Sequence, residues 1–256
     1  MIRRYHYWVL ISLLVLIMGA GQNTNTTPQQ TSGAAAMDVP LQLIAEAQQS
    51  YQSLTDYTCL FVKREHLRGR LQPDNLMLMK VRCQPFSVYL RWLKPGELAG
   101  QEACYVAGRN NGMLRAHSTG VAGTVGFISL DPNDPRCLEN SRHAITEAGI
   151  GYLIDRLGKH WEAERQLSRT WVRSAEYEYD KRRCTRVELI HSDPAGGQLS
   201  FYRTVVYFDK QTRLPIRIEN YDWPRQGGDL NGALVESYSF ASLRVNVGVP
   251  AATFEH

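Results

Sequence analysis

The chain has 256 residues, of which 43% are hydrophobic and 21% charged, and its formal net charge is +4. These proportions are ordinary for a globular protein with a sizeable core. The one dense basic run is the cluster of Lys181, Arg182, Arg183 and Arg186, which is interpreted as a solvated turn. A nucleic-acid partner is not expected, because a protein that follows phosphates needs a concentrated basic face.

Residues 1–21 are typical of a signal peptide. Arg3 and Arg4 precede an apolar run over residues 8–20, which is shorter than the about 20 residues of a membrane-spanning helix and ends in small residues suited to cleavage. The alternative is an uncleaved anchor, and in both cases the rest of the chain is expected in the periplasm or otherwise exported. Residues 22–37 are small, polar and aperiodic, which predicts a disordered linker before a single domain over residues 38–256.

Two amphipathic helices are expected in the folded part. Asp38 as N-cap and Pro40 in the first turn mark the start of one, and apolar residues recur at helical spacing over residues 43–54. The other is expected to follow a cap at Thr146. Its apolar stripe comprises Ile150, Leu153, Ile154, Leu157 and Trp161.

The first predicted hairpin brings two cysteines together. Residues 57–65 and 76–83 have the period of two that indicates strands, and a turn centred near residues 70–71 would place Cys59 close to Cys83 across the ladder. Export to an oxidising compartment permits a disulfide, and this is the pairing we favour among the five cysteines. None of the five forms a CxxC pair, so zinc and thioredoxin-type chemistry are not expected.

Strands dominate the rest of the chain. Along residues 86–92 apolar side chains at Phe86, Val88, Leu90 and Trp92 face one way, which is typical of an antiparallel strand with one dry face. A further hairpin and a long irregular loop over residues 118–140 follow. Later strands are expected at about residues 170–179, 184–191, 199–208, 215–221 and 233–243. The fold class is therefore α+β, with two helices on one large antiparallel sheet.

The sequence contains none of the common catalytic or nucleotide-binding motifs, and its histidines are scattered. His143, beside Arg142 at the start of an expected helix, is the strongest catalytic candidate, but a structural polar pair is the favoured interpretation. Asp131 and Asp134 lack the spacing of a calcium loop. No metal site, no cofactor and no enzymatic activity are expected.

Five segments resemble a bacterial envelope family known as domain of unknown function 1571. They are KVRCQPFSVYLRWLKP (80–95), GQEACYVAGRNNGMLRAH (100–117), SRHAITEAGIGYLIDRL (141–157), YFDKQTRLPIRIENYDWP (207–224) and ALVESYSFASLRVNVG (233–248). In this order they are specific, and together they cover most of residues 41–256. Through Asp209, Thr212, Pro215 and Phe254 the tail is also similar, more distantly, to periplasmic lipoprotein carriers of the Lol type.

The carrier resemblance implies a strongly curved, unclosed antiparallel sheet, an open half-barrel whose concave apolar face is covered by helices and admits acyl chains. The cysteines and the long central loop depart from the carrier pattern. The expected partner is a lipid or a lipidated protein, with peripheral contact to a membrane or to another envelope protein. The candidate ligand-binding residues are Tyr57, Phe61, Met77, Met79, Phe86, Val88, Leu90, Trp92, Ile150, Leu153 and Leu157.

Three alternatives to a lipid-binding cavity remain open at this point. In the first, the apolar face is a filled core rather than a cavity. In the second, the protein is a non-enzymatic assembly factor of the envelope that presents an apolar patch or a free strand edge to a partner. In the third, it is a hydrolase with an unfamiliar site near Arg142 and His143.

Overall fold

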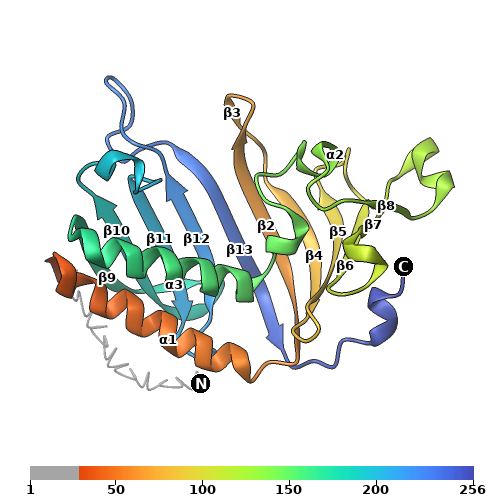
Figure 1. The fold of residues 1–256 in the computed structure, drawn as a ribbon, viewed down its shortest axis with the longest axis horizontal. Coiled ribbons are helices and arrows are strands. Elements are labelled where there is room, and N and C mark those ends of the chain that lie inside the picture. The colour runs from red at the N-terminus through yellow and green to blue at the C-terminus, as the bar shows by residue number, and fades with distance from the viewer. Residues whose placement is uncertain (1–28) are drawn as a thin grey trace, which may run out of the picture.

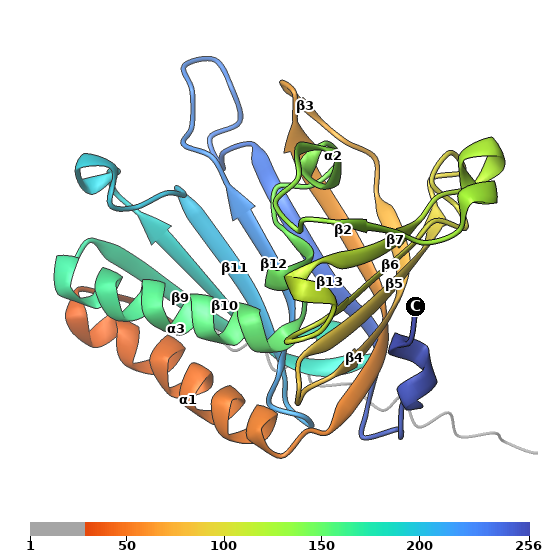
Figure 2. The ribbon, with the colours of Figure 1, turned by 45° about the vertical axis from the view of Figure 1, so that its right-hand side comes forward.

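One antiparallel sheet of 13 strands dominates the structure, a computed structural model that describes residues 29–256. Its strands are β1 (Gln29–Ser32), β2 (Asp56–Leu67), β3 (Arg70–Leu71), β4 (Asn75–Arg82), β5 (Ser87–Lys94), β6 (Glu102–Val106), β7 (Leu114–His117), β8 (Ile128–Leu130), β9 (Thr170–Tyr179), β10 (Arg182–His191), β11 (Arg203–Asp209), β12 (Pro215–Tyr221) and β13 (Leu234–Val245). They are ordered β1-β9-β10-β11-β12-β13-β2-β4-β5-β6-β7-β8, with β3 beside β2. Because β1 and β8 lie at opposite ends of this order, the sheet is unclosed, and Figure 2 shows its curvature.

Two long helices lie side by side on the concave face. They are α1 (Asp38–Gln52) and α3 (Ile150–Leu167), and they cross the part of the sheet from β9 to β12 (Figure 1). Shorter helical pieces are α2 (Pro135–Leu138), η1 (Ala34–Met37), η2 (Asn110–Gly112), η3 (Gly120–Val125), η4 (Ile145–Glu147), η5 (Ala195–Gly197) and η6 (Ala251–Phe254). The expected α+β fold, with a large curved antiparallel sheet and helices on its concave face, is confirmed.

The core fills the space between the helices and the sheet. Along β4 buried and half-buried residues alternate, as the period of two requires when one face of a strand is covered. The predicted stripe of α3 is buried at Ile150, Ile154, Leu157 and Trp161. The ring of Trp161 packs against the ring of Phe208 on β11, with the two centroids 6.3 Å apart, and this contact joins α3 to the sheet.

Glycine allows α3 to approach α1 closely. A Cβ atom at Gly151 would lie 2.6 Å from the ring of Tyr51, a distance that real Cβ atoms do not show. We expect Gly151→Ala to lower the free energy of unfolding by ~1–2 kcal/mol, because overpacking outweighs the gain of about 1 kcal/mol in helix propensity. Urea unfolding monitored by circular dichroism measures this. In a Tyr51→Ala background the cost should vanish, and an equal cost in both backgrounds would contradict the packing argument.

The signal peptide predicted for residues 1–21 lies outside the described residues, but the linker predicted for residues 22–37 is wrong in its last part. Residues 29–32 form β1, which pairs with β9, and the turn that follows buries Ala36 and Met37. The ladder satisfies backbone groups at the edge of β9, and the two apolar side chains add to the core. The folded structure therefore includes residues before the predicted start at 38.

The predicted disulfide is also wrong. The β2 hairpin turns at Arg68 and Gly69, which both have positive φ, rather than near residues 70–71. This two-residue turn sets a register in which Met79, not Cys83, lies opposite Cys59. Both cysteines are free thiols, as are the other three.

The predicted N-cap of α3 at Thr146 is wrong by several residues. Residues 145–147 form the separate turn η4, and α3 begins at Ile150 after Gly149. The hydroxyl of Tyr57 accepts a hydrogen bond from the backbone N–H of Ile150 at 2.9 Å and so satisfies one of the free donors at the helix start. Gly149 has a φ of 97°, and a Cβ atom there would lie 2.6 Å from this hydroxyl, so the position requires glycine.

Two smaller expectations change as well. The loop predicted over residues 118–140 is not irregular throughout, because it contains η3, β8 and α2. The strand predicted at residues 199–208 begins only at Arg203. By contrast, β9 and β12 have the predicted ends.

Candidate functional site

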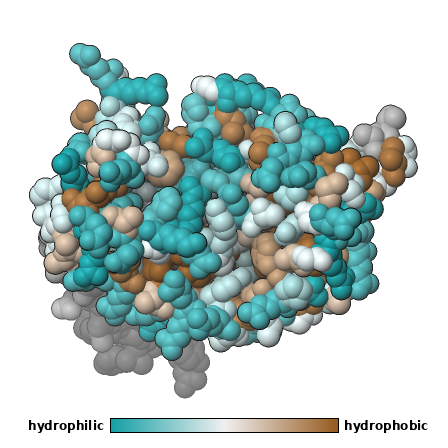
Figure 3. All heavy atoms as spheres, viewed as in Figure 1, coloured by the Kyte–Doolittle hydropathy of each residue, from teal (hydrophilic) through white to brown (hydrophobic). Residues whose placement is uncertain are grey.

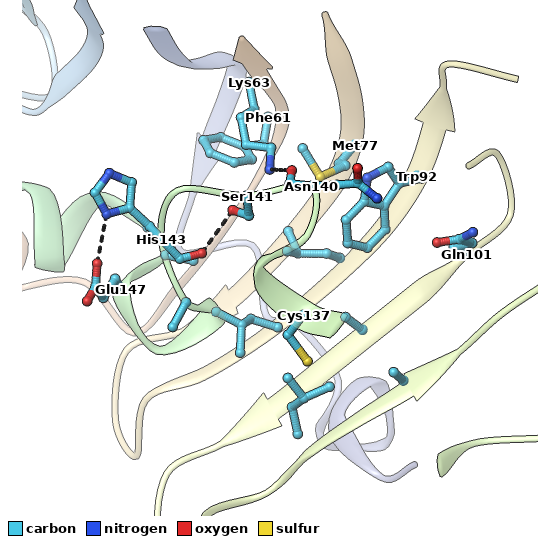
Figure 4. Close-up of a pocket in the computed structure, with 18 of the residues that line it drawn as sticks. Phe61, Lys63, Met77, Trp92, Gln101, Cys137, Asn140, Ser141, His143 and Glu147 are labelled. Atoms are coloured by element: carbon cyan, nitrogen blue, oxygen red, sulfur yellow. Dashed lines mark hydrogen bonds and ion pairs between the residues drawn. The ribbon is translucent and has the colours of Figure 1, made fainter. Parts of the chain in front are cut away.

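A cavity of about 400 Å³ lies on the concave side of the sheet. Strands β2, β4 to β8, β12 and β13 contribute one wall, and the other comes from the segment that joins β8 to α3 and from the start of α3. Figure 4 shows side chains of both walls around the same space. Its volume falls within the roughly 300–1,000 Å³ of ligand-binding pockets in proteins.

Five of the side chains proposed from the sequence line this cavity. They are Phe61, Met77, Leu90, Trp92 and Leu153. Four others are fully buried in the core: Tyr57, Met79, Val88 and Ile150. Leu157 lines a second cavity, and Phe86 packs against Tyr105 with ring centroids 6.3 Å apart. The concave face is therefore filled core in one part and cavity in another.

The lining on β6, β7 and β8 is not singled out by sequence analysis. Its apolar members are Ala103, Leu114, Ala116, Ile128 and Leu130, and its polar members are Glu102 and His117. Strand β7 has four residues and β8 only three, so neither is long enough to display an alternating pattern.

Buried charge fixes the segment between β8 and α3 to the sheet. The side chain of Lys63 on β2 is only 9% exposed, and its Nζ donates a hydrogen bond to the carbonyl oxygen of Asn140 at 2.8 Å (Figure 4). One residue further on, the Ser141 hydroxyl donates to the carbonyl oxygen of His143 at 2.9 Å. The segment is thus held over the cavity by specific polar contacts as well as by apolar packing.

Glu236 on β13 is the centre of a buried polar network. Its side chain is 1% exposed, and its Oε2 accepts hydrogen bonds from Nε of Arg142 at 2.9 Å and from Nε2 of His143 at 3.1 Å. Its Oε1 accepts one from Nδ2 of Asn220 at 2.9 Å. A single carboxylate on the sheet therefore binds two side chains of the segment over the cavity.

Burial and charge act in opposite directions on the pair of Glu236 and His143. Burial favours the neutral carboxyl, but hydrogen bonds from His143 and Asn220 and the charges of His143 and Arg156 outweigh it, and the pKa of Glu236 falls from 4.5 to about 2. Burial also disfavours the charged imidazole, yet Glu236 and Glu147 raise the pKa of His143 above its ordinary value. The two residues therefore form an ion pair.

A second buried carboxylate, that of Glu65 on β2, adjoins this network. Its Oε1 accepts a hydrogen bond from the Tyr238 hydroxyl at 2.6 Å, and its Oε2 lies 3.2 Å from Nζ of Lys63. Burial lowers the pKa of Lys63 and outweighs the negative charge of Glu65, which acts to raise it. Burial and the neighbouring carboxylates raise the pKa of Tyr238, so this hydroxyl stays protonated and can donate.

His143 has no free ring nitrogen with which to act as a catalytic base. Its Nδ1 lies 2.9 Å from Oε2 of Glu147 and its Nε2 lies 3.1 Å from Oε2 of Glu236, so both nitrogens donate to carboxylates. The nearby Ser141 hydroxyl bonds to a backbone carbonyl and not to the imidazole. This geometry favours the interpretation of His143 and Arg142 as a structural polar pair.

A second cavity, of about 300 Å³, adjoins the first between α3 and the sheet. His191 on β10, one of its lining residues, connects the sheet to α3, since its Nε2 lies 3.2 Å from Oε2 of Glu164 and its Nδ1 lies 2.6 Å from the carbonyl oxygen of Phe201. Burial opposes the charge of this imidazole, but Glu164 raises the pKa of His191 above its ordinary value.

Within residues 29–256, no group of three or more His, Cys, Asp or Glu side chains is arranged to hold a metal ion. In the same part of the chain, no helix has both the length and the apolar character needed to cross a membrane.

The fold and the site define an α+β protein whose unclosed antiparallel sheet carries helices and a largely apolar cavity on its concave face. Residues 54–256 match the family described as protein of unknown function DUF1571, and the chain belongs to this family. The family resemblance seen in the sequence is thereby confirmed. None of the curated proteins matches the chain.

Several solved structures are similar to this one at low sequence identity. An uncharacterized conserved protein from Thermus thermophilus is 9% identical, with a TM-score of 0.47 over 85% of this chain and 93% of that one. The lipoprotein LppX from Mycobacterium tuberculosis is 10% identical, with a TM-score of 0.47 over 83% and 97%. A LolA superfamily protein from Nitrosomonas europaea is 10% identical, with a TM-score of 0.33 over 83% and 96%.

Proposed function

We propose that this protein is an exported protein of the cell envelope that binds an apolar ligand, a lipid or the acyl chain of a lipidated protein, in the cavity on the concave face. The observation that carries the proposal is the cavity itself, a space of about 400 Å³ bounded by apolar side chains such as Met77, Leu90 and Leu114. An alkyl chain placed there gains about 0.8 kcal/mol for each buried CH₂ group. Met77 favours such a ligand further, because methionine adapts to irregular apolar partners.

The entrance is proposed at the β8 end of the cavity. Ile128 on β8 and Tyr152 on α3 line the cavity and are also exposed, by 42% and 38%. Val125, just before β8, is 74% exposed, and Figure 3 shows hydrophobic side chains gathered at this end of the molecule. Exposed apolar groups at an entrance suit peripheral contact with a membrane or with a lipidated partner.

Export is proposed from residues 1–21, whose positive start, apolar run and small residues are typical of a signal peptide. We propose binding without catalysis, because the best candidate base, His143, has both ring nitrogens engaged by carboxylates.

Filling the cavity tests the function. We expect Ala116→Phe on β7 to weaken binding of dodecanol, an uncharged alkyl probe, by about tenfold or more, because the ring excludes roughly two CH₂ groups at ~0.8 kcal/mol each. Isothermal titration calorimetry measures the affinity, and native mass spectrometry with lipid extraction measures what the protein carries when purified from the periplasm. Ala175→Phe on β9, outside both cavities, is the matched control. The proposal is contradicted if the folded Ala116→Phe variant binds dodecanol with normal affinity. It is also contradicted if the unaltered protein does not bind dodecanol.

A further inference from the structure

Arg156 on α3 lies where the two cavities meet. It lines both of them, together with Leu153 from the same helix and with Ile218 and Tyr238 from the sheet. The side chain is half-buried. A ligand that extends from one cavity toward the other therefore passes the guanidinium group of Arg156.

This guanidinium forms no salt bridge in the part of the chain that the structure describes, although its charge acts from beyond salt-bridge distance to lower the pKa of Glu236. The carboxylates of Glu147 and Glu236 lie nearby, but no carboxylate oxygen lies within 4.0 Å of its nitrogens. Its Nη1 lies 3.3 and 3.4 Å from the two ring nitrogens of His143. Since both of those nitrogens donate to carboxylates, the ring has no lone pair left to accept from Arg156.

The acidic groups around Arg156 are already bound by other partners. Glu236 accepts from Arg142, His143 and Asn220, and Glu147 binds His143. An arginine stays charged in proteins and presents five N–H donors in a planar fork that fits carboxylate and phosphate. Arg156 is thus a cation without a neutralising contact at the junction of two cavities.

The two cavities differ in the polarity of their lining side chains, which increases from the first cavity to the second. The first is lined mainly by apolar side chains, whereas Lys159, His160, Gln198 and Ser200 line the second beyond Arg156. The carboxylates of Glu164 and Glu236 also line the second cavity, but both are bound by cationic side chains, Glu164 by His191 and Glu236 by Arg142 and His143. A molecule that satisfies both environments is apolar at one end and polar at the other.

We propose that Arg156 is the headgroup subsite of an anionic amphiphile, a lipid with a carboxylate or phosphate headgroup, whose alkyl chain occupies the first cavity and whose head faces the second. The inference rests on the proposed function and specifies its ligand class. The headgroup supplies the acceptor oxygens that Arg156 lacks, through charge-assisted hydrogen bonds.

The test compares probes with one alkyl chain and different heads: dodecanoate, dodecyl phosphate, dodecanol and dodecyltrimethylammonium. Hydrogen bonds to charged groups contribute about 1.5–3 kcal/mol, so we expect Arg156→Gln to weaken binding of the two anions by roughly 10- to 100-fold and to leave dodecanol unchanged. Arg156→Lys should retain part of the preference for anions. Calorimetric titration measures each affinity, and the stronger of the two anions identifies the headgroup.

Arg165→Gln is the matched control, because Arg165 lies on the same helix, outside both cavities, and pairs with Asp38. Unchanged dodecanol binding in Arg156→Gln demonstrates that the variant is folded. Equal affinities for anionic and uncharged probes, or an equal loss for all probes on Arg156→Gln, overturn the subsite but leave the apolar cavity standing. If no probe binds the unaltered protein, the proposed function fails and the subsite with it.

Discussion

Replacing Glu236 with alanine is expected to lower the free energy of unfolding by about 3–5 kcal/mol, the cost of removing one partner from a buried ion pair. The carboxylate is 1% exposed and accepts from Arg142, His143 and Asn220. Without it, Arg142 loses its counter-charge, His143 keeps only that of Glu147, and the buried amide of Asn220 loses an acceptor.

Urea unfolding followed by circular dichroism measures this loss. Glu46→Ala is the control, because the ion pair of Glu46 with Arg213 is exposed and pairs of that kind contribute about 0–1 kcal/mol. Glu236→Gln keeps the shape of the side chain and removes only its charge, so its cost should lie between the other two. A loss for Glu236→Ala no larger than that for Glu46→Ala would show that the network does not stabilise the fold.

Most strands and helices of this protein can be predicted from its sequence. Strand β9 and strand β12 end where turn residues interrupt a period of two, and the α3 stripe is buried as its spacing requires. These features depend on residues within a few positions of one another. Local pattern is therefore enough to predict them.

The register between β2 and β4 in the first hairpin cannot be predicted from local pattern in the same way. It depends on a turn in which Arg68, with a φ of 51°, adopts the left-handed conformation beside Gly69. Asparagine and aspartate mark such positions far more often than arginine does, so the sequence gives no local signal for a turn at residue 68. The error moves Cys83 away from Cys59 and removes the predicted disulfide.

The polar side of the site is hidden from sequence analysis for another reason. Glu236 and His143 are 93 residues apart, and each looks like a solvated residue in its own segment. Only the sheet order, which places β13 beside β2, brings Glu236 next to Glu65 and beneath the segment that carries His143. The apolar half of the cavity, in contrast, is partly predicted, because Met77 and Leu90 belong to strands with visible alternation.

The same network predicts how stability depends on pH. The pKa of Glu236 is lowered from 4.5 to about 2, so its contribution is present above pH 4.5 and is lost as the pH falls toward 2. A shift of this size corresponds to about 3 kcal/mol. The pKa values of His143 and His191 are raised, so their contributions are present below 6.5 and are lost as the pH rises through the folded-state values.

We therefore expect the free energy of unfolding to be highest between about pH 5 and 6.5 and to decline on both sides. Urea unfolding at a series of pH values measures the profile. Glu236→Gln should flatten the part of the acid side that is due to Glu236. It should leave the part due to other carboxyl groups with lowered pKa values, which are Glu188, where Arg203 and Arg186 outweigh the effect of burial, and the surface residues Asp134, Glu176 and Asp193. His191→Gln should reduce the decline at higher pH without changing the acid side, because His191 contacts Glu164 and not Glu236. An acid decline that is as steep in Glu236→Gln as in the unaltered protein would mean that other carboxylates control it.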